Sequence, residues 1–551
     1  MNSVSRSSGS QKSRIIVPVL LLLAILFCAL LPIVSLVWIS LISTADVWPH
    51  LINYVLPNAL FDTLLLLLLV GLGTGIIGVA AAWVTTVCNF PGRTIFTWAM
   101  VLPLAVPTYI AAYAHVEFFD FSGPLQSYLR HWLGYTNARD YWFPDIRSVW
   151  GAGFVLSSVL YPYVFLTCRL VFSSHGASLL DASRSLGASP HRVFREIGLP
   201  MVRPALAAGG ALALMETLND IGAVEILGVK TLTFAVFETW LNRGSLAGAS
   251  QLALLTLIIV AGLIWVERYA RRKRDYASST RERPPARLQL TPFKQALCLL
   301  LCLVPLVAGL LIPIYVLAGF ALPRLDQLAN SGLMEATQNS LLIAILSATF
   351  AVTITYLVLQ YGRLSKRPYV STIGRIASLG YAVPGTVLAI GLLIPIATFD
   401  NWLDGLFRDW FNISTGLLIS GSIALLVYAC TLRFLAIAFG TMETGFQKIS
   451  PNIDLATRAL GRSSGELGWQ IHRPMMAKTM AIAFFFVFVD TMKELSATLL
   501  LRPFNFETLA TFVYDRASQA AIEEAASGSL LIIAVGLISI AVLNRLTNQT
   551  A

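Results

Sequence analysis

Two pairs of acidic residues lie inside long apolar stretches of this sequence. Glu216 and Asp220 are four residues apart, and Asp490 and Glu494 repeat that spacing in the second half of the chain. Because side chains four residues apart are neighbours on a helix surface, each pair is expected to share one helix face. Carboxylate oxygens are the ligands that hard, highly charged cations prefer. The pattern therefore predicts an acidic lining for the passage of a small multivalent cation, with these four residues as transient metal ligands.

The energetic cost of these acids limits where they can lie. A charged residue at the centre of a membrane span costs roughly 2.5–3.5 kcal/mol, so four would cost on the order of 10 kcal/mol against lipid. They are therefore expected to face a water-filled cavity or partners. Counted from a helix start near residue 203, the first pair lies about 20–26 Å along its span, in the outer half of the membrane. Two alternatives stay open: an internal ion pair with Lys493 or Lys230, or simple solvation.

The elements that carry these acids are membrane spans. The chain of 551 residues is 56% hydrophobic and only 12% charged, which excludes an ordinary soluble domain. Apolar runs long enough to cross about 30 Å of hydrocarbon recur along its whole length. The expected spans are 15–42, 59–86, 94–117, 147–173, 201–227, 249–267, 294–321, 337–360, 370–397, 414–438, 475–500 and 527–544. The fold class is therefore an all-α polytopic membrane protein with about twelve transmembrane helices.

Charge placement sets the expected topology. The net charge of +10 is concentrated in alternate loops, as membrane orientation requires, and so does not indicate nucleic acid binding. The most basic segment, from Arg271 to Arg287, marks a cytoplasmic linker. Counting spans from it places both termini in the cytoplasm. The expected organisation is a tail (1–14), a first transmembrane domain (15–269), the linker (270–293) and a second transmembrane domain (294–545). The six cysteines lack metal-site spacing.

The two transmembrane domains are copies of each other. Asp62-Thr63-Leu64 corresponds to Asn339-Ser340-Leu341, and Thr231-Leu232 corresponds to Thr508-Leu509 with the same offset in the sequence. Shared apolar composition does not explain polar residues falling in register. The sequence therefore predicts two tandem six-helix halves related by a pseudo-two-fold axis along the membrane normal.

A polar loop is duplicated with them. The first copy reads Asp181-Ala182-Ser183, then Gly187, then Ile197-Gly198-Leu199-Pro200, and the second reads Asp454-Leu455-Ala456, then Gly461, Ile471 and Pro474. Each copy is expected to form a short helix, a glycine turn, a second short helix and a proline that opens the next span. Both copies are expected on the cytoplasmic side. His191 and His472, which also lie in these loops, are expected to pack at the surface.

At these loops the chain resembles the permease subunits of binding-protein-dependent ABC importers. Their signature loop reads Glu-Ala-Ala, three residues, Gly, nine residues, Ile, any residue, Leu-Pro. The resemblance implies the type I (MetI-like) importer fold and a docking site for one cytoplasmic ATPase subunit on each loop. The docking residues that it implies are Asp181, Ala182, Gly187, Ile197, Leu199, Pro200, Asp454, Ala456, Gly461, Ile471 and Pro474. The second copy departs from the pattern, because Leu455 takes the acidic position and Arg473 precedes Pro474.

The segments after each loop narrow the resemblance to the ferric-iron permeases, in which two halves are fused in one chain. Glu216 to Ala223 and Lys493 to Phe506 carry this likeness. It implies a multi-pass protein of the bacterial inner membrane, surrounded by lipid, a periplasmic iron-binding protein and a homodimeric ATPase that holds ATP and Mg²⁺. Fused permeases for thiamine, aminophosphonate or another small solute share the layout and stay open as alternatives, as does a secondary cation transporter. No phosphate-binding P-loop occurs, so this chain is expected to be neither an enzyme nor a cofactor-binding protein.

Overall fold

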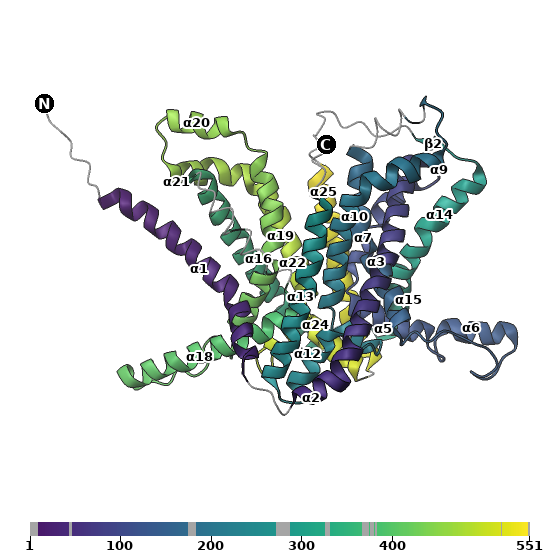
Figure 1. Cartoon of the computed structure of the whole chain (residues 1–551), viewed down its shortest axis with the longest axis horizontal. Helices are drawn as coiled ribbons and strands as arrows, with labels where there is room; N and C mark the ends of the chain where they lie inside the picture. Colours follow the sequence, from purple (N-terminus) through teal and green to yellow (C-terminus); the bar gives the residue numbers. More distant parts are fainter. Residues whose placement is uncertain are drawn as a thin grey trace. The chain divides into compact units, whose positions relative to one another are not determined.

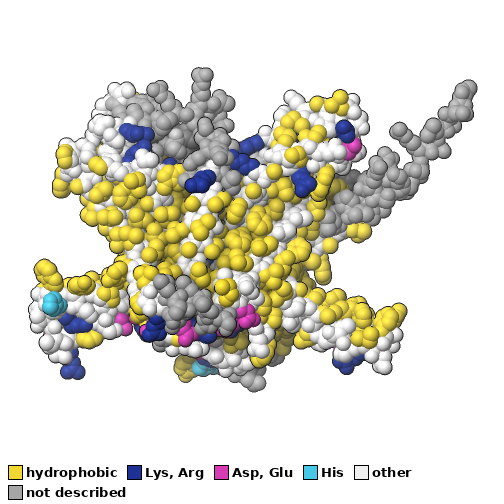
Figure 2. Space-filling model, turned by 180° about the vertical axis from the view of Figure 1, so that it is seen from behind, with side chains coloured by type: hydrophobic (Ala, Val, Ile, Leu, Met, Phe, Trp, Pro, Cys, Tyr) yellow, Lys and Arg dark blue, Asp and Glu magenta, His cyan; other side chains and the backbone are white. Residues whose placement is uncertain are grey.

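The computed structural model describes residues 9–42, 47–174, 183, 185–271, 287–324, 331–365, 374, 380, 383–519 and 521–548. Within these ranges, eleven helices are long and apolar enough to cross a membrane, or up to twelve if one bent pair counts as a single span. This agrees with the predicted all-α polytopic fold. Figure 2 shows hydrophobic side chains over the middle of the visible surface, with Lys and Arg gathered mainly beyond that apolar region.

The described chain packs as two compact units, and neither is one half of the sequence. Unit 1 contains residues 1–42, 335–510 and 541–551, and unit 2 contains residues 43–334 and 511–540. The first helix of each half therefore packs with the other half of the sequence. The domain boundaries 15–269 and 294–545 describe the two copies of the sequence repeat and stay a prediction. They differ from the packing units because a repeat in sequence does not determine which copy a helix packs against.

Unit 2 is built around α3 (Leu56–Val87) and α7 (Val149–Ser174), which pack along each other. Glycines allow this approach, since a Cβ on Gly78 would lie 2.6 Å from the Cβ of Val164. Figure 1 labels most of the longer helices of this unit. Its other elements are α2 (Trp48–His50), η1 (Leu51–Val55), β1 (Cys88–Asn89), α4 (Arg93–Ala99), η2 (Leu102–Ala105), α5 (Thr108–Phe119), α6 (Pro124–Leu133), α9 (Pro190–Val193), η3 (Phe194–Gly198), α10 (Leu199–Asn219), α11 (Gly222–Ile226), α12 (Leu232–Leu241), α13 (Leu246–Arg271), β2 (Leu288–Gln289), α14 (Pro292–Leu306), η4 (Val307–Leu311), α15 (Ile312–Ala321) and most of α24 (Leu509–Ser518) and α25 (Ile522–Asn548).

Unit 1 is built around α19 (Ile423–Gln447) and α22 (Arg473–Met492), which also lie side by side in Figure 1. The N-terminal helix α1 (Gly9–Ser40) packs on α18 (Gly385–Phe411), where a Cβ on Gly391 would lie 2.3 Å from the carbonyl oxygen of Pro32. The remaining elements are α16 (Ser331–Ser365), α20 (Pro451–Ala459), α21 (Ser464–Glu466), η7 (Leu467–His472) and α23 (Ser496–Leu501).

Residues that correspond in the two halves of the sequence make the same contact in both units. In unit 2 the Thr63 hydroxyl accepts a hydrogen bond from the backbone N–H of Leu232 at 2.9 Å. In unit 1 the Ser340 hydroxyl accepts one from the N–H of Leu509 at 2.6 Å. The correspondence between the two halves therefore extends to this hydrogen bond, and each hydroxyl satisfies a backbone donor at a helix N-terminus.

Four predicted spans are interrupted in the described residues. The one expected at 370–397 is broken at Pro384 (φ −54°, ψ 144°), and α18 begins after it and continues to Phe411. The span expected at 94–117 is a pair of segments, Arg93–Ala105 and Thr108–Leu133, bent by 97°. Pro107 separates them with an extended backbone (φ −58°, ψ 143°), which a helix cannot continue through. The helices expected at 201–227 and 475–500 end early, at Asn219 and Met492.

Candidate docking loops and membrane carboxylates

The second signature loop is described throughout its backbone and has the predicted helix-turn-helix form. The helix α20 ends at Ala459, and Gly461 then adopts a left-handed conformation with φ of 76°. After the turn, Ser463 and Glu466 cap the next helix reciprocally. The Ser463 N–H donates to the Glu466 carboxylate at 2.7 Å, and the Glu466 N–H donates to the Ser463 hydroxyl at 3.3 Å. Pro474 occupies the first turn of α22, as predicted.

The first loop has the same turn where it is described. Gly187 has φ of 82°, and Pro200 lies in the first turn of α10. Ile197 packs on the buried pair Val87 and Val193. Asp181 and Ala182 lie outside the described residues. The predicted glycine turn is thus confirmed in both copies, and its glycine is left-handed, a conformation that residues with a Cβ rarely adopt.

Asp454, predicted to dock the ATPase, points into its own unit. Its carboxylate lies 2.8 Å from Nε of Arg363, at the end of α16, and 2.8 Å from Nε2 of His472. Burial alone would raise the pKa of Asp454, but hydrogen bonds and charge from Arg363 and His472 outweigh it and hold the pKa below 3.8. These contacts also place the second loop beside the end of α16, as the predicted topology requires.

His472 was predicted to pack at the surface, and this is wrong. Its side chain is fully buried, and Nδ1 lies 2.8 Å from Oε1 of Gln360. Arg363 also donates to the backbone carbonyls of Phe446 and Ile449 at 2.9 and 3.0 Å. We name Gln360, Arg363, Asp454 and His472 the loop clamp. It joins α16 and α20 to the end of η7, which α22 continues directly. His191 is exposed, in agreement with its prediction.

Two leucines that sequence reasoning left out are the most exposed apolar groups of the loops. Leu186 is 88% exposed and Leu460 is 82% exposed, and each directly precedes the left-handed glycine. They occupy the same position in the two copies of the loop. A leucine at the same position of both loops was the signal that could have identified them. Their exposure leaves both leucines accessible to a partner.

The two acidic pairs do not lie on continuous helix faces. The helix α10 ends at Asn219, and Asp220 follows in an extended conformation. Likewise α22 ends at Met492, before Glu494. The i, i+4 prediction fails because it assumed an unbroken helix. Asp220 and Glu494 instead have the same structural role. The Asp220 carboxylate accepts a hydrogen bond from the N–H of Ala223, and the Glu494 carboxylate accepts one from the N–H of Ala497, each at 2.8 Å. Both cap the short helix that follows.

Both acids of the second pair have basic partners inside unit 1. Glu494 forms an ion pair with Arg433, and the two side chains are 1% and 7% exposed. Asp490 lies 2.8 Å from Nζ of Lys493, the partner that the sequence left open. In unit 2, Glu216 is half-buried at the end of α10. Within the described residues, no group of three or more His, Cys, Asp or Glu side chains could hold a metal ion.

One further acid beside a broken span escaped the sequence reading. Glu225, on α11, accepts a hydrogen bond from the hydroxyl of Tyr514, on α24, and both residues belong to unit 2. The equivalent position to Glu225 in the second half of the chain is Leu499. Because this acid has no acidic counterpart, the repeat that revealed the two pairs could not reveal it.

Comparison with known proteins places this architecture in a family. Residues 74–275 match the model of the inner membrane component of binding-protein-dependent transport systems. The chain is 25% identical to an Fe(3+)-transport system permease protein from Haemophilus influenzae, over 87% of this chain and 88% of the relative. It is 30% identical to the sulfate transport system permease of Salmonella typhimurium over 37% of this chain and 70% of the relative. It is 28% identical to the molybdenum transport system permease of Escherichia coli over 36% of this chain and 86% of the relative. The chain therefore belongs to the inner membrane components of binding-protein-dependent ABC importers, as a multi-pass permease with two fused halves.

Proposed function

We propose that this permease imports ferric iron, which a periplasmic binding protein delivers. The observation that carries the proposal is the extent of the match. The iron permease aligns over both halves of the chain, whereas the sulfate and molybdenum permeases align over little more than a third of it. Permeases of the same architecture for thiamine, aminophosphonate or another small solute, and a secondary cation transporter, are the alternatives.

The conformational change that ATP drives is proposed to reach the permease through the two signature loops. A homodimeric cytoplasmic ATPase, which holds ATP and Mg²⁺, would receive Leu186 and Leu460 in equivalent clefts. Closure of the ATPase on binding ATP would pull both loops, and the loop clamp would carry that motion into α16 and α22. Opening and closing of the pathway would then follow as an alternation between two states. The equivalence of the two leucines in the sequence repeat supports a partner with two equivalent sites.

Of the four acids predicted to line the pathway, two are retained in the proposal. Arg433 and Lys493 neutralise Glu494 and Asp490 within unit 1, so these acids contribute little free negative charge. Glu216 and Asp220 stay the proposed contacts for the cation. Weak binding suits this role, because an ion held tightly in the pathway would not be released.

Transport by purified protein tests the substrate. The chain is reconstituted with its ATPase and binding protein, and uptake of radioactive iron is measured with ferric iron, sulfate, molybdate or thiamine as unlabelled competitor. Only ferric iron is expected to suppress the signal. Saturable uptake of another solute without iron uptake would overturn the assignment.

Co-purification tests the docking surface separately. Leu186→Asp and Leu460→Asp together are expected to abolish co-purification of the ATPase while the permease stays folded. Leu417→Asp is the matched control, because Leu417 is also exposed (53%) but lies outside both loops. Retention of the ATPase by the loop variant would contradict docking at these leucines.

A further inference from the structure

Two thiols from distant parts of the chain meet at the end of α3 in unit 2. Cys88, the residue that follows α3, and Cys298, on α14, are hydrogen-bonded to each other through their side chains. Cys302, one turn further along α14, lies near both of them. All three are thiols rather than disulfides. Cys88 and Cys298 are 6% and 9% exposed, whereas Cys302 is fully buried, so a small oxidant in water reaches the hydrogen-bonded pair first.

The backbone around the two thiols holds them together. Cys88 begins the short strand β1, which pairs in parallel with β2, the strand that leads into α14. The Asn89 side-chain amide also donates a hydrogen bond to the Gln289 side chain at 3.1 Å. The helix α14 itself packs on α3. Because strand pairing and helix packing both fix this junction, the contact between the thiols does not depend on one side-chain rotamer.

Positive charge surrounds Cys88. Arg93 donates to the backbone carbonyl of Thr85, one turn before Cys88, at 2.9 Å, and so offsets the negative end of the α3 dipole. Arg287 directly precedes Leu288, the strand partner of Cys88. It lies close enough to Arg93 for the two charges to interact. Reactive cysteines are found in such electropositive surroundings, because the thiolate is the nucleophile.

We propose that Cys88 and Cys298 are a redox-sensitive pair that hydrogen peroxide converts to a disulfide. The Cys88 thiolate attacks one peroxide oxygen and becomes a sulfenic acid, while the other oxygen leaves as hydroxide and takes up the thiol proton as water. The Cys298 sulfur then displaces the sulfenic oxygen, which leaves with the Cys298 proton as a second water. Two electrons pass from the two thiols to the peroxide, and an S–S bond replaces the O–O bond.

Cys302 cannot take the place of Cys88 in this reaction. Residues one turn apart on a helix have Cβ atoms about 5–6 Å apart. A disulfide requires a Cβ separation of roughly 3.5–4.5 Å. A bond between Cys298 and Cys302 would therefore distort α14, whereas Cys88 approaches Cys298 from a different element. The described part of the chain offers no three-ligand metal site, so metal binding does not account for the three thiols.

The thiol pair borders the packing that anchors the first signature loop. Val87, the residue before Cys88, packs with Val193 of α9. Ile197 and Leu288 cover the same cluster, and Leu288 is the strand partner of Cys88. A bond between Cys88 and α14 would therefore restrain the surface on which the loop rests.

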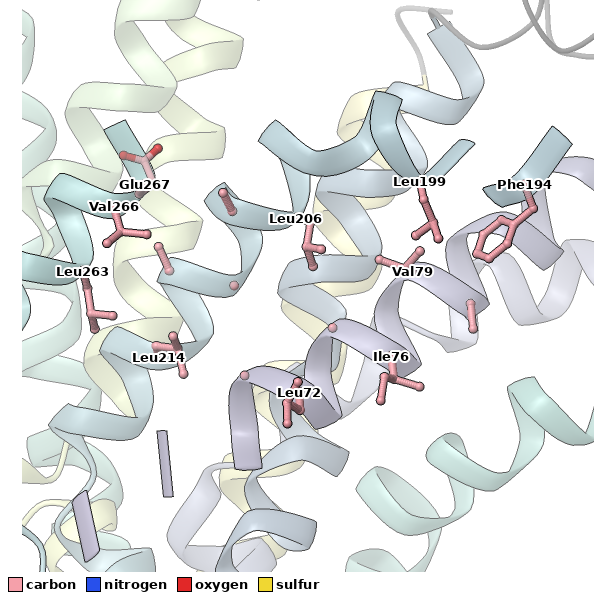
Figure 3. Close-up of a pocket in the computed structure, with 16 residues that line it drawn as sticks. Leu72, Ile76, Val79, Phe194, Leu199, Leu206, Leu214, Leu263, Val266 and Glu267 are labelled. Carbon is pink, nitrogen blue, oxygen red and sulfur yellow. The ribbon is translucent and has the colours of Figure 1, made fainter. Parts of the chain in front are cut away.

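The segment that follows the loop also rests on α3. Phe194 and Leu199 line one apolar pocket together with Val79 of α3, and Figure 3 shows the three side chains at the same end of it. In the second half of the chain Ser365 takes the position of Cys88, so the repeat does not provide the second loop with the same pair. Oxidation should thus slow transport by restraining one loop. This consequence rests on the proposed function, whereas formation of the disulfide does not.

Mass spectrometry of the oxidised full chain tests the disulfide. The purified permease is treated with hydrogen peroxide, the remaining thiols are blocked with N-ethylmaleimide, and linked peptides are identified with and without dithiothreitol. A link between Cys88 and Cys298 is expected, with the loss of two of the six thiols. The link should be absent from Cys88→Ser and from Cys298→Ser. It should persist in Cys302→Ser, the control, which changes a neighbouring thiol on the same helix.

Hydrogen exchange measures the consequence for the loop without any solute. After oxidation, exchange of residues 188–198 should slow, exchange of residues 460–472 in the second loop should not change, and dithiothreitol should restore the original rate. The Cys298→Ser variant, treated in the same way, should show no change. A count of six thiols after peroxide treatment, a sulfinic acid on Cys88 without a link, or a link between Cys298 and Cys302 would overturn the proposed pair.

A disulfide that leaves exchange of residues 188–198 unchanged would overturn its connection to the loop. Neither measurement involves iron uptake, so failure here is distinct from failure of the proposed function.

Discussion

Replacing Glu494 with glutamine separates a structural role of this acid from a role in the transport pathway. In the structure the carboxylate accepts hydrogen bonds from Arg433, from the N–H of Ala497 and from the N–H and hydroxyl of Thr498. Glutamine keeps an acceptor for the backbone but removes the charge. Arg433 then stays buried, with 7% of its side chain exposed, and loses this anionic partner.

The size of the effect follows from that burial. Removing one member of a buried ion pair costs about 3–5 kcal/mol, because the remaining charge is uncompensated. The second substitution, Arg433→Met, should therefore restore most of the stability when combined with Glu494→Gln. We expect a coupling free energy of about 2–3 kcal/mol in the double-mutant cycle. Asp490→Asn is the control, since Asp490 and Lys493 keep 20% and 25% of their side chains exposed and water can replace part of the lost interaction.

Two assays on the same variants give the result. Heat-induced loss of monodisperse protein in detergent reports stability, and reconstituted uptake reports transport. If Glu494 is structural, Glu494→Gln loses both and the double variant regains both. A double variant that is as stable as the parent but does not transport would refute this reasoning and support direct contact between Glu494 and the solute.

The signature loops give two further predictions. Alanine at Gly187 or Gly461 should strain the turn by about 1–2 kcal/mol, because the φ angles are 82° and 76°. Each variant should therefore hydrolyse more ATP per solute transported. Gly465→Ala is the control, since Gly465 lies in the second loop without a positive φ, and an unchanged ratio of ATP to solute in the Gly187 and Gly461 variants would count against a rigid turn. Asp454 has a lowered pKa, so its stabilisation of the loop is present above its unfolded value near 3.8 and is lost as pH falls through the lower folded value. Hydrogen exchange of residues 451–472 should thus stay slow down to about pH 4, and Arg363→Gln should move the onset of fast exchange to higher pH.

Hydropathy predicted where spans occur better than how they pack. The expected span 249–267 lies within α13, and 147–173 nearly coincides with α7, because burial in lipid depends on residue type alone. The bend at Pro107 was not predicted, since an average over a window does not register one backbone break. The exchange of first helices between the units was also not predictable, because apolar stretches of similar composition do not identify their partners.

The carboxylates show how a correct pattern led to an incomplete interpretation. The constant offset between the two copies correctly identified Asp220 and Glu494 as equivalent, and the structure gives them the same hydrogen bond. The helix was extended too far because apolar residues continue beyond each acid. Asp220 with Gly222 two residues later was a local signal for a helix end, since Asp favours capping positions and Gly lowers helix propensity. The partner Arg433, on a different span from Glu494, had no such signal.

The repeat preserves geometry more strictly than residue type, and the loop anchors show why. In unit 2, Trp83 packs edge-on against Phe194, with ring centroids 4.9 Å apart. A Cβ on Gly198 would lie 2.9 Å from the Trp83 ring.

At the equivalent positions in unit 1, Gln360 replaces the tryptophan, Gly468 replaces the phenylalanine and His472 replaces the glycine. The large residue has changed places with the small one, and a Cβ on Gly468 would lie 2.8 Å from Nε2 of Gln360. Close packing requires such compensation, because adding volume on one side without removing it on the other forces side chains out of their preferred rotamers. The loop of unit 2 is thus held by apolar packing of Trp83 and Phe194, whereas the loop of unit 1 is held by hydrogen bonds of Gln360 and His472. Only the hydrogen-bonded arrangement offers a partner to the Asp454 carboxylate. The displaced acid of the second signature is therefore a consequence of how its loop is anchored.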